Sequence, residues 1–532
     1  MKKLATTYKV IKLATLGGGT ELVYADRPKT LTELLDNTVN KYGDQEGLID
    51  QSARLSYRQF ASSVSNVASA LYYNYGIRKG DRVALMLRNG LEFATSFFAL
   101  AKIGAITVPL NTALKGEELA FQVGDSGTAF LIVEHEFHEL VAEVSSATGG
   151  VKHIFVTGGE PPAGTAAFSE LLKHGEHTPV EVRADEMDSA VIMYTSGTTG
   201  RPKGALLSHR SIIASAMNMA RLCDLRIGRD KMLVVVPLFH ITGLAMAFCS
   251  AIYAGIPVVV LKRFKAVDSL KIIEEEKVTT MVAVPTILWL MLNAPEFEQY
   301  NLSSLRQFAA GGSASPEDLL KCCAAKLPGV QLMPGYGLTE AAAMTHTTTS
   351  LNEALSKLGS VGRVLSILDA KVVDSSGGEL PPGEPGELLV RGCQVMKEYW
   401  NNPEATRETI VDGWLHTGDI AKITEEGYTY ILDRMKDMII RGGENIYSIE
   451  VENVLYRNPK VLEAAVVGVP DPVFGEQVKA ALTLRPGEQA TAEEIQEFCG
   501  KYLAYYKVPK YVEFRESLPR NPAGKVIKAR LK

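Results

Sequence analysis

The chain has 532 residues, of which 46% are hydrophobic and 22% charged, so it is long enough for at least two domains with large buried cores. Its formal net charge of −5 argues against broad binding to nucleic acids or anionic membranes, because both require a basic surface. The six cysteines show neither metal-ligand spacing nor a disulfide framework, and they suit a reducing cytoplasm, where we expect the protein to reside.

No stretch of the sequence predicts membrane insertion. The basic start of the chain lacks the sustained apolar run of a signal peptide, because Lys9 and Lys12 interrupt it. No segment reaches the roughly 18 uninterrupted apolar residues of a spanning helix. We therefore expect no integral membrane segment, and no nucleic acid as a partner.

The first part of the chain alternates between helical and strand patterns. Apolar residues recur on one helical face over 60–75, a short strand is expected over 83–87, and a further helix runs through Phe93, Phe97 and Leu100. More strand-like runs follow at 106–108, 130–133, 233–236, 258–261 and 281–284, separated by helical segments such as 267–276. This alternation predicts an α/β fold with parallel sheets.

The segment 194–204, Tyr-Thr-Ser-Gly-Thr-Thr-Gly-Arg-Pro-Lys-Gly, is the most informative feature of the chain. Residues 188–193 predict a buried strand before it and residues 209–223 an amphipathic helix after it, which is a phosphate-binding context. Glycines let the backbone approach phosphate oxygens, Ser and Thr donate hydrogen bonds, and Lys203 supplies charge. The segment is not a Walker A loop, because Gly204 stands where the magnesium-binding hydroxyl would be. A flexible linker is the alternative, but linkers seldom join a buried strand to an amphipathic helix.

The pattern changes twice in the last third of the chain. Residues 358–392 predict short strands broken by Gly and Pro, which is typical of a small β subdomain. After a strand over 430–432 comes the charged segment 433–437, where we place a domain boundary. We therefore expect an N-terminal domain over 1–433 and a small C-terminal α+β domain over 434–532.

The phosphate loop resembles the signature of the adenylate-forming superfamily, which includes acyl-CoA synthetases, firefly luciferase and the adenylation domains of nonribosomal peptide synthetases. Further segments match the motifs of this superfamily in the same order, namely 237–240, 310–313, 336–340, 417–419, 433–437, 442–445 and 519–525. The resemblance spans most of the chain and is greatest for a fatty acyl-CoA ligase. It implies a large N-terminal domain of stacked sheets with helices plus a small β-barrel subdomain, and a mobile C-terminal domain.

The resemblance also implies an activity, that of an ATP-dependent, AMP-forming carboxylic acid:CoA ligase. Such an enzyme lets a carboxylate attack the α-phosphorus of ATP while pyrophosphate departs, so negative charge must be neutralised at several points. ATP, Mg²⁺ and CoA are the expected cofactors and co-substrates, a small carboxylic acid is the expected substrate, and a homo-oligomer is left open. The presence of Lys203, Glu340 and Lys525 argues against a non-catalytic relative, and luciferase-like oxidation is the rarer activity among such sequences.

The nucleotide contacts that the resemblance implies come from several segments. They are Thr195, Ser196, Gly197, Thr198, Thr199, Gly200, Lys203, Gly312, Ser313, Gly335, Tyr336, Gly337, Thr339, Asp419 and Arg434. Tyr336 is expected to face adenine, Thr339 the α-phosphate, and Asp419 the ribose hydroxyls. Glu340 is the expected metal ligand, because Mg²⁺ prefers oxygen. Without the surrounding motifs, Thr339 and Glu340 could equally be a helix N-cap and a first-turn acid.

Three residues are expected to act in catalysis or conformational change. Lys525 is implied to bridge the acyl carboxylate and the α-phosphate, Lys436 to lie at a hinge, and His240 to gate the acyl pocket. Three more, Gly442, Gly443 and Glu444, match a loop that lines the pantetheine tunnel of CoA in the second half-reaction. Each has a plainer alternative, since terminal lysines are mostly solvated, a buried histidine can pack silently, and a glycine pair often marks only a turn.

The acyl pocket is expected to involve His240, Leu244, Gly311, Gly312 and Gly337. The corresponding segments 241–248, 311–313 and 341–344 are almost wholly apolar, and 241–248 contains no acidic partner for an amine. This composition disfavours an α-amino acid and favours a medium- or long-chain fatty acid. An aromatic acid or a hydroxycinnamate is the alternative substrate.

Overall fold

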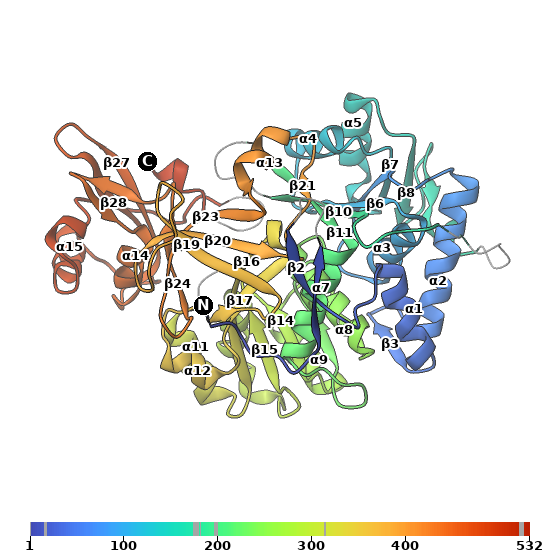
Figure 1. Cartoon of the computed structure of the whole chain (residues 1–532), viewed down its shortest axis with the longest axis horizontal. Coiled ribbons are helices and arrows are strands. Elements are labelled where there is room, and N and C mark those ends of the chain that lie inside the picture. Colours follow the sequence, from blue (N-terminus) through green and yellow to red (C-terminus); the bar gives the residue numbers. More distant parts are fainter. Residues whose placement is uncertain are drawn as a thin grey trace. The chain divides into compact units, whose positions relative to one another are not determined.

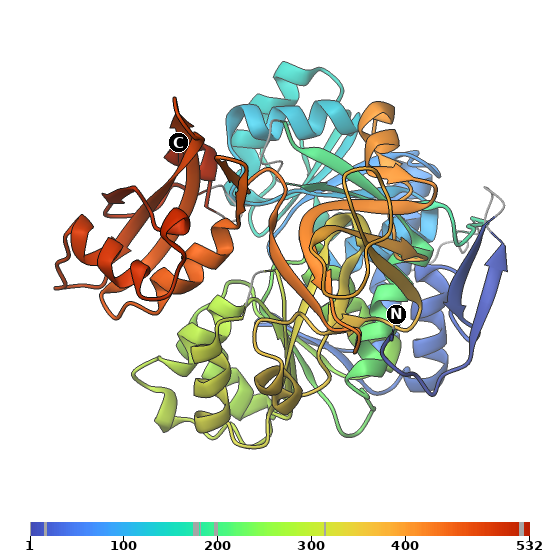
Figure 2. The ribbon, with the colours of Figure 1, turned by 60° about the vertical axis from the view of Figure 1, so that its left-hand side comes forward.

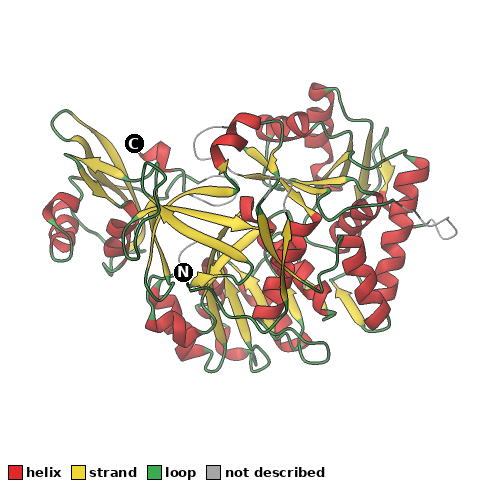
Figure 3. Cartoon of the chain, in the orientation of Figure 1, coloured by secondary structure: helices red, strands yellow, loops and turns green. Residues whose placement is uncertain are grey.

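The computed structural model describes residues 2–14, 19–173, 180, 182–195, 201–312, 315–520 and 526–532. It divides into two compact units. The first contains residues up to Thr195, Pro202–Ala370 and Val390–Leu415, and the second contains Lys371–Leu389 and His416–Lys532. Both units combine strands with helices (Figure 3), which confirms the predicted α/β class.

The first unit contains an eight-stranded sheet of order β21-β11-β10-β6-β5-β7-β8-β9. Strands β5, β6, β7, β8 and β9 are mutually parallel, as expected for strands joined by helical crossovers. In chain order the strands are β5 (Arg82–Met86), β6 (Ile106–Pro109), β7 (Phe130–Glu134), β8 (His153–Thr157), β9 (Ala166–Ala167), β10 (Ser189–Thr195), β11 (Lys203–Ser208) and β21 (Glu398–Tyr399).

A nine-stranded sheet of order β18-β17-β16-β15-β14-β12-β13-β3-β4 forms the second layer of strands in this unit. Its six central strands, from β16 to β3, are parallel, whereas β17, β18 and β4 join antiparallel. The strands are β3 (Glu46–Ile49), β4 (Arg54–Ser56), β12 (Met232–Val234), β13 (Val258–Val260), β14 (Thr280–Ala283), β15 (Gln307–Ala310), β16 (Gln331–Leu338), β17 (Ala343–Thr347) and β18 (Arg363–Val364). A separate hairpin pairs β1 (Val10–Ala14) with β2 (Thr20–Tyr24).

Helices of the first unit pack against these sheets, and Figure 1 shows α1, α2 and α3 side by side. Helix α2 illustrates why they form: Ser56 and Gln59 make a capping box, and Phe60, Val64 and Val67 bury one face. The described helices are α1 (Leu31–Tyr42), α2 (Tyr57–Ser69), α3 (Leu91–Ile103), α4 (Gly116–Ser126), α5 (His138–Thr148), α6 (Phe168–Leu172), α7 (His209–Leu222), α8 (Ser250–Ala254), α9 (Ala266–Glu276), α10 (Pro285–Leu292), α11 (Glu317–Lys326), α12 (Leu351–Ser356) and α13 (Pro403–Thr409). Two π-helical segments, η1 (Ala70–Asn74) and η3 (Thr242–Cys249), extend α2 and precede α8.

The sequence analysis missed one strand after the phosphate loop. Residues 203–208 form strand β11, which pairs antiparallel with β10, and helix α7 begins at His209, where the sequence predicts it. The expected order of strand, loop and helix therefore becomes strand, loop, strand and helix. The run 204–208 is buried and short, and it lies between β10 and β21, which satisfies its backbone on both sides.

A buried asparagine ties the two large sheets together at the carboxyl ends of their strands. Asn89, after β5, accepts a hydrogen bond from the Leu238 N–H at 2.7 Å. Its amide nitrogen donates to the carbonyl oxygens of Val236, after β12, and Leu261, after β13, at 3.0 and 3.2 Å. One side chain thus fixes the segment that follows β12, which carries His240.

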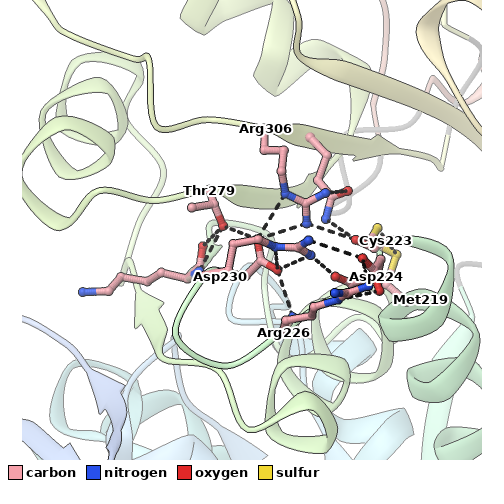
Figure 4. A network of polar contacts seen from close by, with 10 residues as sticks. Met219, Cys223, Asp224, Arg226, Asp230, Thr279 and Arg306 are labelled. Carbon is pink, nitrogen blue, oxygen red and sulfur yellow. Dashed lines mark hydrogen bonds and ion pairs between the residues drawn. The ribbon is translucent and has the colours of Figure 1, made fainter.

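A second polar network lies at the opposite end of the strands (Figure 4). The carboxylate of Asp230, which is 3% exposed, accepts hydrogen bonds from Arg306 at 3.0 Å, Thr279 at 3.1 Å and the Arg226 N–H at 2.9 Å. Burial raises the pKa of Asp230, but the hydrogen bonds from Arg229, Arg226 and Arg306 outweigh it, and the pKa is lowered overall. The network joins the ends of α7, β14 and β15.

A five-stranded sheet of order β19-β20-β23-β22, with β24 paired to β23, follows the large sheets in the chain. It contains β19 (Leu368–Val373), β20 (Gly386–Gly392), β22 (Ile410–Val411), β23 (Trp414–Ile423) and β24 (Thr429–Arg434). Between residues 363 and 392 the chain forms short strands separated by turns, as the sequence predicts for this region.

The C-terminal part of the second unit is a small α+β structure (Figure 2, red). Strands β26-β25-β28-β27, with β29 beside β28, form its sheet. Its elements are β25 (Ile439–Arg441), β26 (Glu444–Ile446), α14 (Ser448–Tyr456), β27 (Val461–Asp471), β28 (Gly475–Leu484), α15 (Ala492–Gly500) and β29 (Tyr511–Phe514). The helices α14 and α15 cover an apolar core that includes Val451, Leu455, Val466 and Ile495. Across the described ranges, none of the helices combines the length and apolar character needed to cross a bilayer.

Candidate active site

A cavity of about 210 Å³ lies in the first unit, at the carboxyl ends of β15 and β16, where ligands of parallel sheets are usually bound. Its lining comes from β15, β16, η5 (Thr339–Ala341), β17 and η3. The lining residues are Ile241, Thr242, Met246, Ala310, Gly311, Gly312, Gly335, Tyr336, Gly337, Leu338, Thr339, Ala343 and Met344. Six of the residues that the sequence pointed to, from Gly311 to Thr339, therefore line one cavity.

The wall of this cavity depends on a close approach of two strands. A Cβ atom on Gly337 would lie 1.7 Å from the carbonyl oxygen of Ala343, so only glycine fits at this position. The turn between β16 and β17 places Ala342 at φ 49° and Ala343 at φ 88°, a left-handed backbone that residues with a side chain rarely adopt. Such a conformation costs about 1–3 kcal/mol per residue and requires support from its surroundings.

That support comes from Gln394, a fully buried side chain that sequence reasoning missed. Its amide nitrogen donates to the carbonyl oxygens of Ala341 and Met344, each at 3.1 Å. No local pattern could have indicated this contact, because Gln394 lies 50 residues from Met344 in the sequence.

Lys203 and Glu340, which the sequence assigned to phosphate and metal binding, both lie beside Tyr399. The Tyr399 hydroxyl donates to Glu340 Oε1 at 2.8 Å, and the Lys203 Nζ atom lies 5.0 Å from the centroid of the Tyr399 ring. Strand pairing between β11 and β21 holds Tyr399 there, since Ala205 and Tyr399 are register partners. Tyr399 is a second residue that sequence reasoning missed.

The structure places Thr339 and Glu340 in η5, a three-residue 3₁₀ turn in which Leu338 is the N-cap residue and no side chain caps the N-terminus. Thr339 is therefore not an N-cap, whereas Glu340 does lie in the first turn. The Glu340 carboxylate accepts a hydrogen bond from Tyr399. Upstream, the Thr195 hydroxyl donates to the Lys203 carbonyl oxygen at 3.3 Å, which closes the hairpin below the phosphate loop.

His240 and Leu244 precede or belong to η3 but are absent from the described lining of the cavity. The side chain of Leu244 is fully buried. The His240 ring makes an edge contact with Phe239 at 4.8 Å between ring centroids, and burial lowers the pKa of His240 to about 4. His240 is therefore neutral at pH 7, which suits packing or steric gating better than charge stabilisation.

In the second unit, Asp419 and Arg434 form an ion pair. They are register partners on β23 and β24, and Arg434 Nε lies 2.9 Å from Asp419 Oδ1. The Asp419 backbone N–H bonds to the Thr417 hydroxyl at 3.1 Å, and that hydroxyl donates to the Leu388 carbonyl oxygen at 2.7 Å. The strand pairing therefore presents a carboxylate whose position is fixed by its neighbours.

The segment 434–444 contains two turns. Lys436 is half-buried in the first, where the Asp437 N–H bonds to the Arg434 carbonyl oxygen at 2.9 Å. Gly442 and Gly443 form the second, an exposed two-residue hairpin between β25 and β26 with φ of 60° and 89°. Positive φ at both positions is the requirement of a type I′ turn, which explains the glycine pair without reference to a ligand. Glu444 is exposed at the start of β26.

Several expected site residues, namely Ser196, Gly197, Thr198, Thr199, Gly200, Ser313 and Lys525, lie outside the described residues.

The donor set around Glu340 fits a magnesium ion held partly by substrate. Within the described ranges no cluster of three or more His, Cys, Asp and Glu side chains could hold a metal by itself. Mg²⁺ in nucleotide enzymes commonly takes one or two carboxylates together with substrate phosphates and water. A single carboxylate oriented by a tyrosine hydroxyl suits that mode.

Comparisons with known proteins agree with this geometry. The model of the AMP-binding enzyme family matches residues 35–400, and that of the AMP-binding enzyme C-terminal domain matches residues 450–525. The long-chain-fatty-acid–CoA ligase FadD13 of Mycobacterium tuberculosis is 38% identical over 485 residues, covering 90% of this chain and 93% of that protein. A feruloyl-CoA synthase of Amycolatopsis is 38% identical over 478 residues, again with 90% and 93% covered.

A solved structure is similar over nearly the whole chain. It is o-succinylbenzoate coenzyme A synthetase (MenE) of Bacillus subtilis in complex with ATP and magnesium ion, with a TM-score of 0.83, 33% identity, and 94% of this chain and 98% of that chain covered. A family match of this extent defines the type of reaction. The chain belongs to the AMP-binding enzyme family and is an AMP-forming acid–CoA ligase of the adenylate-forming superfamily.

Proposed function

We propose that this ligase activates a medium- or long-chain fatty acid. The cavity carries the proposal, because no charged side chain occurs among its described lining residues. A buried ammonium group without a partner is strongly unfavourable, so an α-amino acid is disfavoured. An alkyl chain gains about 0.8 kcal/mol for each CH₂ that it buries. Met246 and Met344, which have flexible side chains, can adapt the cavity to such a chain.

The proposed first step joins the acid to AMP, with ATP and Mg²⁺ as the other reactants. Lys203 and the loop that precedes it neutralise the β- and γ-phosphates, Thr339 donates to the α-phosphate, and Glu340 provides a metal ligand. The contact of Tyr399 with Glu340 and the proximity of its ring to Lys203 support this arrangement. Bound Mg²⁺ would supply positive charge to the departing pyrophosphate.

Further residues are proposed to bind the nucleoside. Tyr336 offers an aromatic face for adenine, and the Asp419 carboxylate accepts the ribose hydroxyls with Arg434 as its companion. Support comes from the position of Tyr336 in the cavity lining and from the fixed Asp419–Arg434 pair.

The proposed second step transfers the acyl group to the thiol of CoA. Residues 434–532 act as a mobile domain that turns about Lys436 relative to residues 1–433. One orientation delivers Lys525 to the acyl carboxylate and the α-phosphate, and the other brings Gly442, Gly443 and Glu444 to the pantetheine. The location of Lys436 in a turn between β24 and β25 supports this proposal.

An aromatic acid or hydroxycinnamate is the second candidate substrate. The volume of about 210 Å³ favours it, because a cavity of about 150 Å³ is already large enough for benzene. The feruloyl-CoA synthase and FadD13 are equally similar to this chain, at 38% identity each, so similarity does not separate the candidates.

A substrate panel tests these candidates. Pyrophosphate release is measured with straight-chain acids of increasing length, benzoate, ferulate and amino acids, with and without CoA. For a fatty-acid ligase we expect kcat/KM to rise about fourfold per added CH₂ until the cavity is filled. Preference for ferulate would establish the second candidate, and release of ADP and phosphate would contradict the AMP-forming mechanism.

We infer a cytoplasmic location from the cysteines, all six of which are free thiols in the fold. Burial raises the pKa of the Cys323 and Cys393 thiols to about 12, so they are protonated and unreactive. A homo-oligomer is compatible with this proposal, and light scattering of the purified protein measures the state directly.

A further inference from the structure

The turn that connects the proposed metal ligand to the acyl cavity has an unusual backbone. It runs from Ala341 to Met344, directly after Glu340, and Met344 lines the cavity. Ala342 and Ala343 both have positive φ, at 49° and 88°. Two consecutive alanines in this conformation need an external constraint.

Gln394 provides that constraint from outside the turn. Its amide nitrogen donates to the carbonyl oxygens of Ala341 and Met344, so the two hydrogen bonds bracket both strained residues. The side chain is completely buried, and water therefore cannot replace these bonds if the amide is removed.

The Gln394 amide is itself held in one orientation. Its carbonyl oxygen accepts a hydrogen bond from Asn218 Nδ2 at 2.5 Å, and Asn218 Oδ1 accepts one from the Tyr24 hydroxyl at 2.7 Å. Asn218 is 4% exposed and Tyr24 is 3% exposed. This buried chain leaves the nitrogen of Gln394 as the group that faces the turn.

We propose that Gln394 is a positioning residue for the ligase reaction, which fixes the distance between the Glu340 carboxylate and the Met344 wall of the acyl cavity. The inference rests on the proposed roles of Glu340 and of the cavity. By fixing that distance, Gln394 aligns the acyl carboxylate with the metal-bound phosphates. A small misplacement of reacting groups is known to reduce rates strongly.

The test is Gln394→Met, which keeps the size of the side chain and removes its two donated hydrogen bonds to the turn together with the one that it accepts from Asn218. We expect kcat/KM for the acid to fall at least tenfold, and both the KM for the acid and the half-saturating Mg²⁺ concentration to rise. The KM for CoA should change less than twofold, because the turn has no proposed contact with CoA.

Gln307→Met is the matched control. Gln307 is 3% exposed, and its amide nitrogen donates to the Cys223 carbonyl oxygen at 3.0 Å while its amide oxygen accepts from Arg306 at 3.1 Å. We expect this variant to lower the melting temperature while leaving both KM values and the Mg²⁺ dependence unchanged. Equal kinetic losses in the two variants would show only general destabilisation and would overturn the proposal.

Two further measurements separate positioning from catalysis. Hydrogen exchange of the amides in 340–345, including the Ala342 N–H that bonds to the Thr339 carbonyl oxygen, should accelerate at least tenfold in Gln394→Met and not in Gln307→Met. Adding Ala342→Gly to Gln394→Met should restore kcat/KM at least threefold, since glycine accepts positive φ. Unchanged hydrogen exchange in Gln394→Met would refute the proposal, even if the enzyme proved to use another substrate. A failure of Ala342→Gly to restore kcat/KM would also refute it.

Discussion

Removing the hydroxyl of Tyr399 tests the proposed metal site most directly. Tyr399→Phe deletes the donor that lies 2.8 Å from Glu340 Oε1 but keeps the ring, which is 6% exposed and lies beside Lys203. A hydrogen bond to a charged group contributes about 1.5–3 kcal/mol, which corresponds to roughly 10- to 150-fold in an equilibrium constant. We therefore expect the half-saturating Mg²⁺ concentration to rise at least tenfold, with turnover recovering at high Mg²⁺ because Glu340 is retained.

The assay is pyrophosphate release over a magnesium titration at saturating ATP and acid. Tyr57→Phe is the control, because the fully buried Tyr57 hydroxyl also donates a hydrogen bond, to the Ile256 carbonyl oxygen at 2.7 Å. Tyr57 has no proposed contact with metal or nucleotide, so this control should leave the titration unchanged. An unaltered titration in Tyr399→Phe, or equal shifts in both variants, would refute the reasoning that Glu340 is a metal ligand oriented by Tyr399.

Three further predictions concern the cavity, the two half-reactions and acid stability. A Cβ atom on Gly311 would lie 3.5 Å from the Gly335 carbonyl oxygen, which is an ordinary contact, so the enzyme should tolerate Gly311→Ala. The larger side chain of Gly311→Leu should fill the cavity and raise the KM for the acid at least tenfold in steady-state assays. Lys525→Ala should slow acyl-adenylate formation about a hundredfold and spare thioester formation from pre-made adenylate, whereas Gly443→Val should do the reverse, as separate half-reaction assays will show. Because the pKa of Asp230 is lowered in the fold, its carboxylate stabilises the protein fully above the ordinary value of 3.8 and loses this effect as pH falls from there through the lowered pKa of the folded state. Asp230→Asn should therefore reduce the melting temperature at pH 7, and by progressively less as pH falls below 3.8.

The spacing of apolar residues along the chain was sufficient to predict many of the helices and strands. The helical face over 60–75 corresponds to α2 and η1, and the runs at 83–87 and 281–284 correspond to β5 and β14. In these segments the apolar residues of a helix face or of a whole strand are buried against other apolar residues. The apolar pattern in the sequence therefore agrees with the burial that the fold requires. Strand β11 was not predicted, and it pairs on one side with β10 and on the other with β21, which lies almost 200 residues later in the chain.

The candidate site shows the same division between local and long-range information. Motifs indicated Gly311, Tyr336 and Thr339, which lie on consecutive strands or turns and meet at one edge of a sheet. Tyr399 and Gln394 carried no comparable signal, because a tyrosine or glutamine in a strand or turn has many ordinary roles. Only the pairing of β11 with β21 and the folding of the 392–398 segment onto the turn after η5 bring them to the site.

The position of Asn89 has a consequence for how the first unit unfolds. The Asn89 amide follows β5 of the eight-stranded sheet, and it satisfies one backbone N–H and two carbonyl oxygens that follow β12 and β13 of the nine-stranded sheet. Sliding one sheet away from the other would leave polar groups on each side without partners in an apolar interior, and each such group is costly there. Separating the two sheets while each stays folded therefore gains little conformational entropy and loses the hydrogen bonds of Asn89. The eight-stranded and nine-stranded sheets should lose their structure in one cooperative transition, so neither sheet is an independently stable fragment.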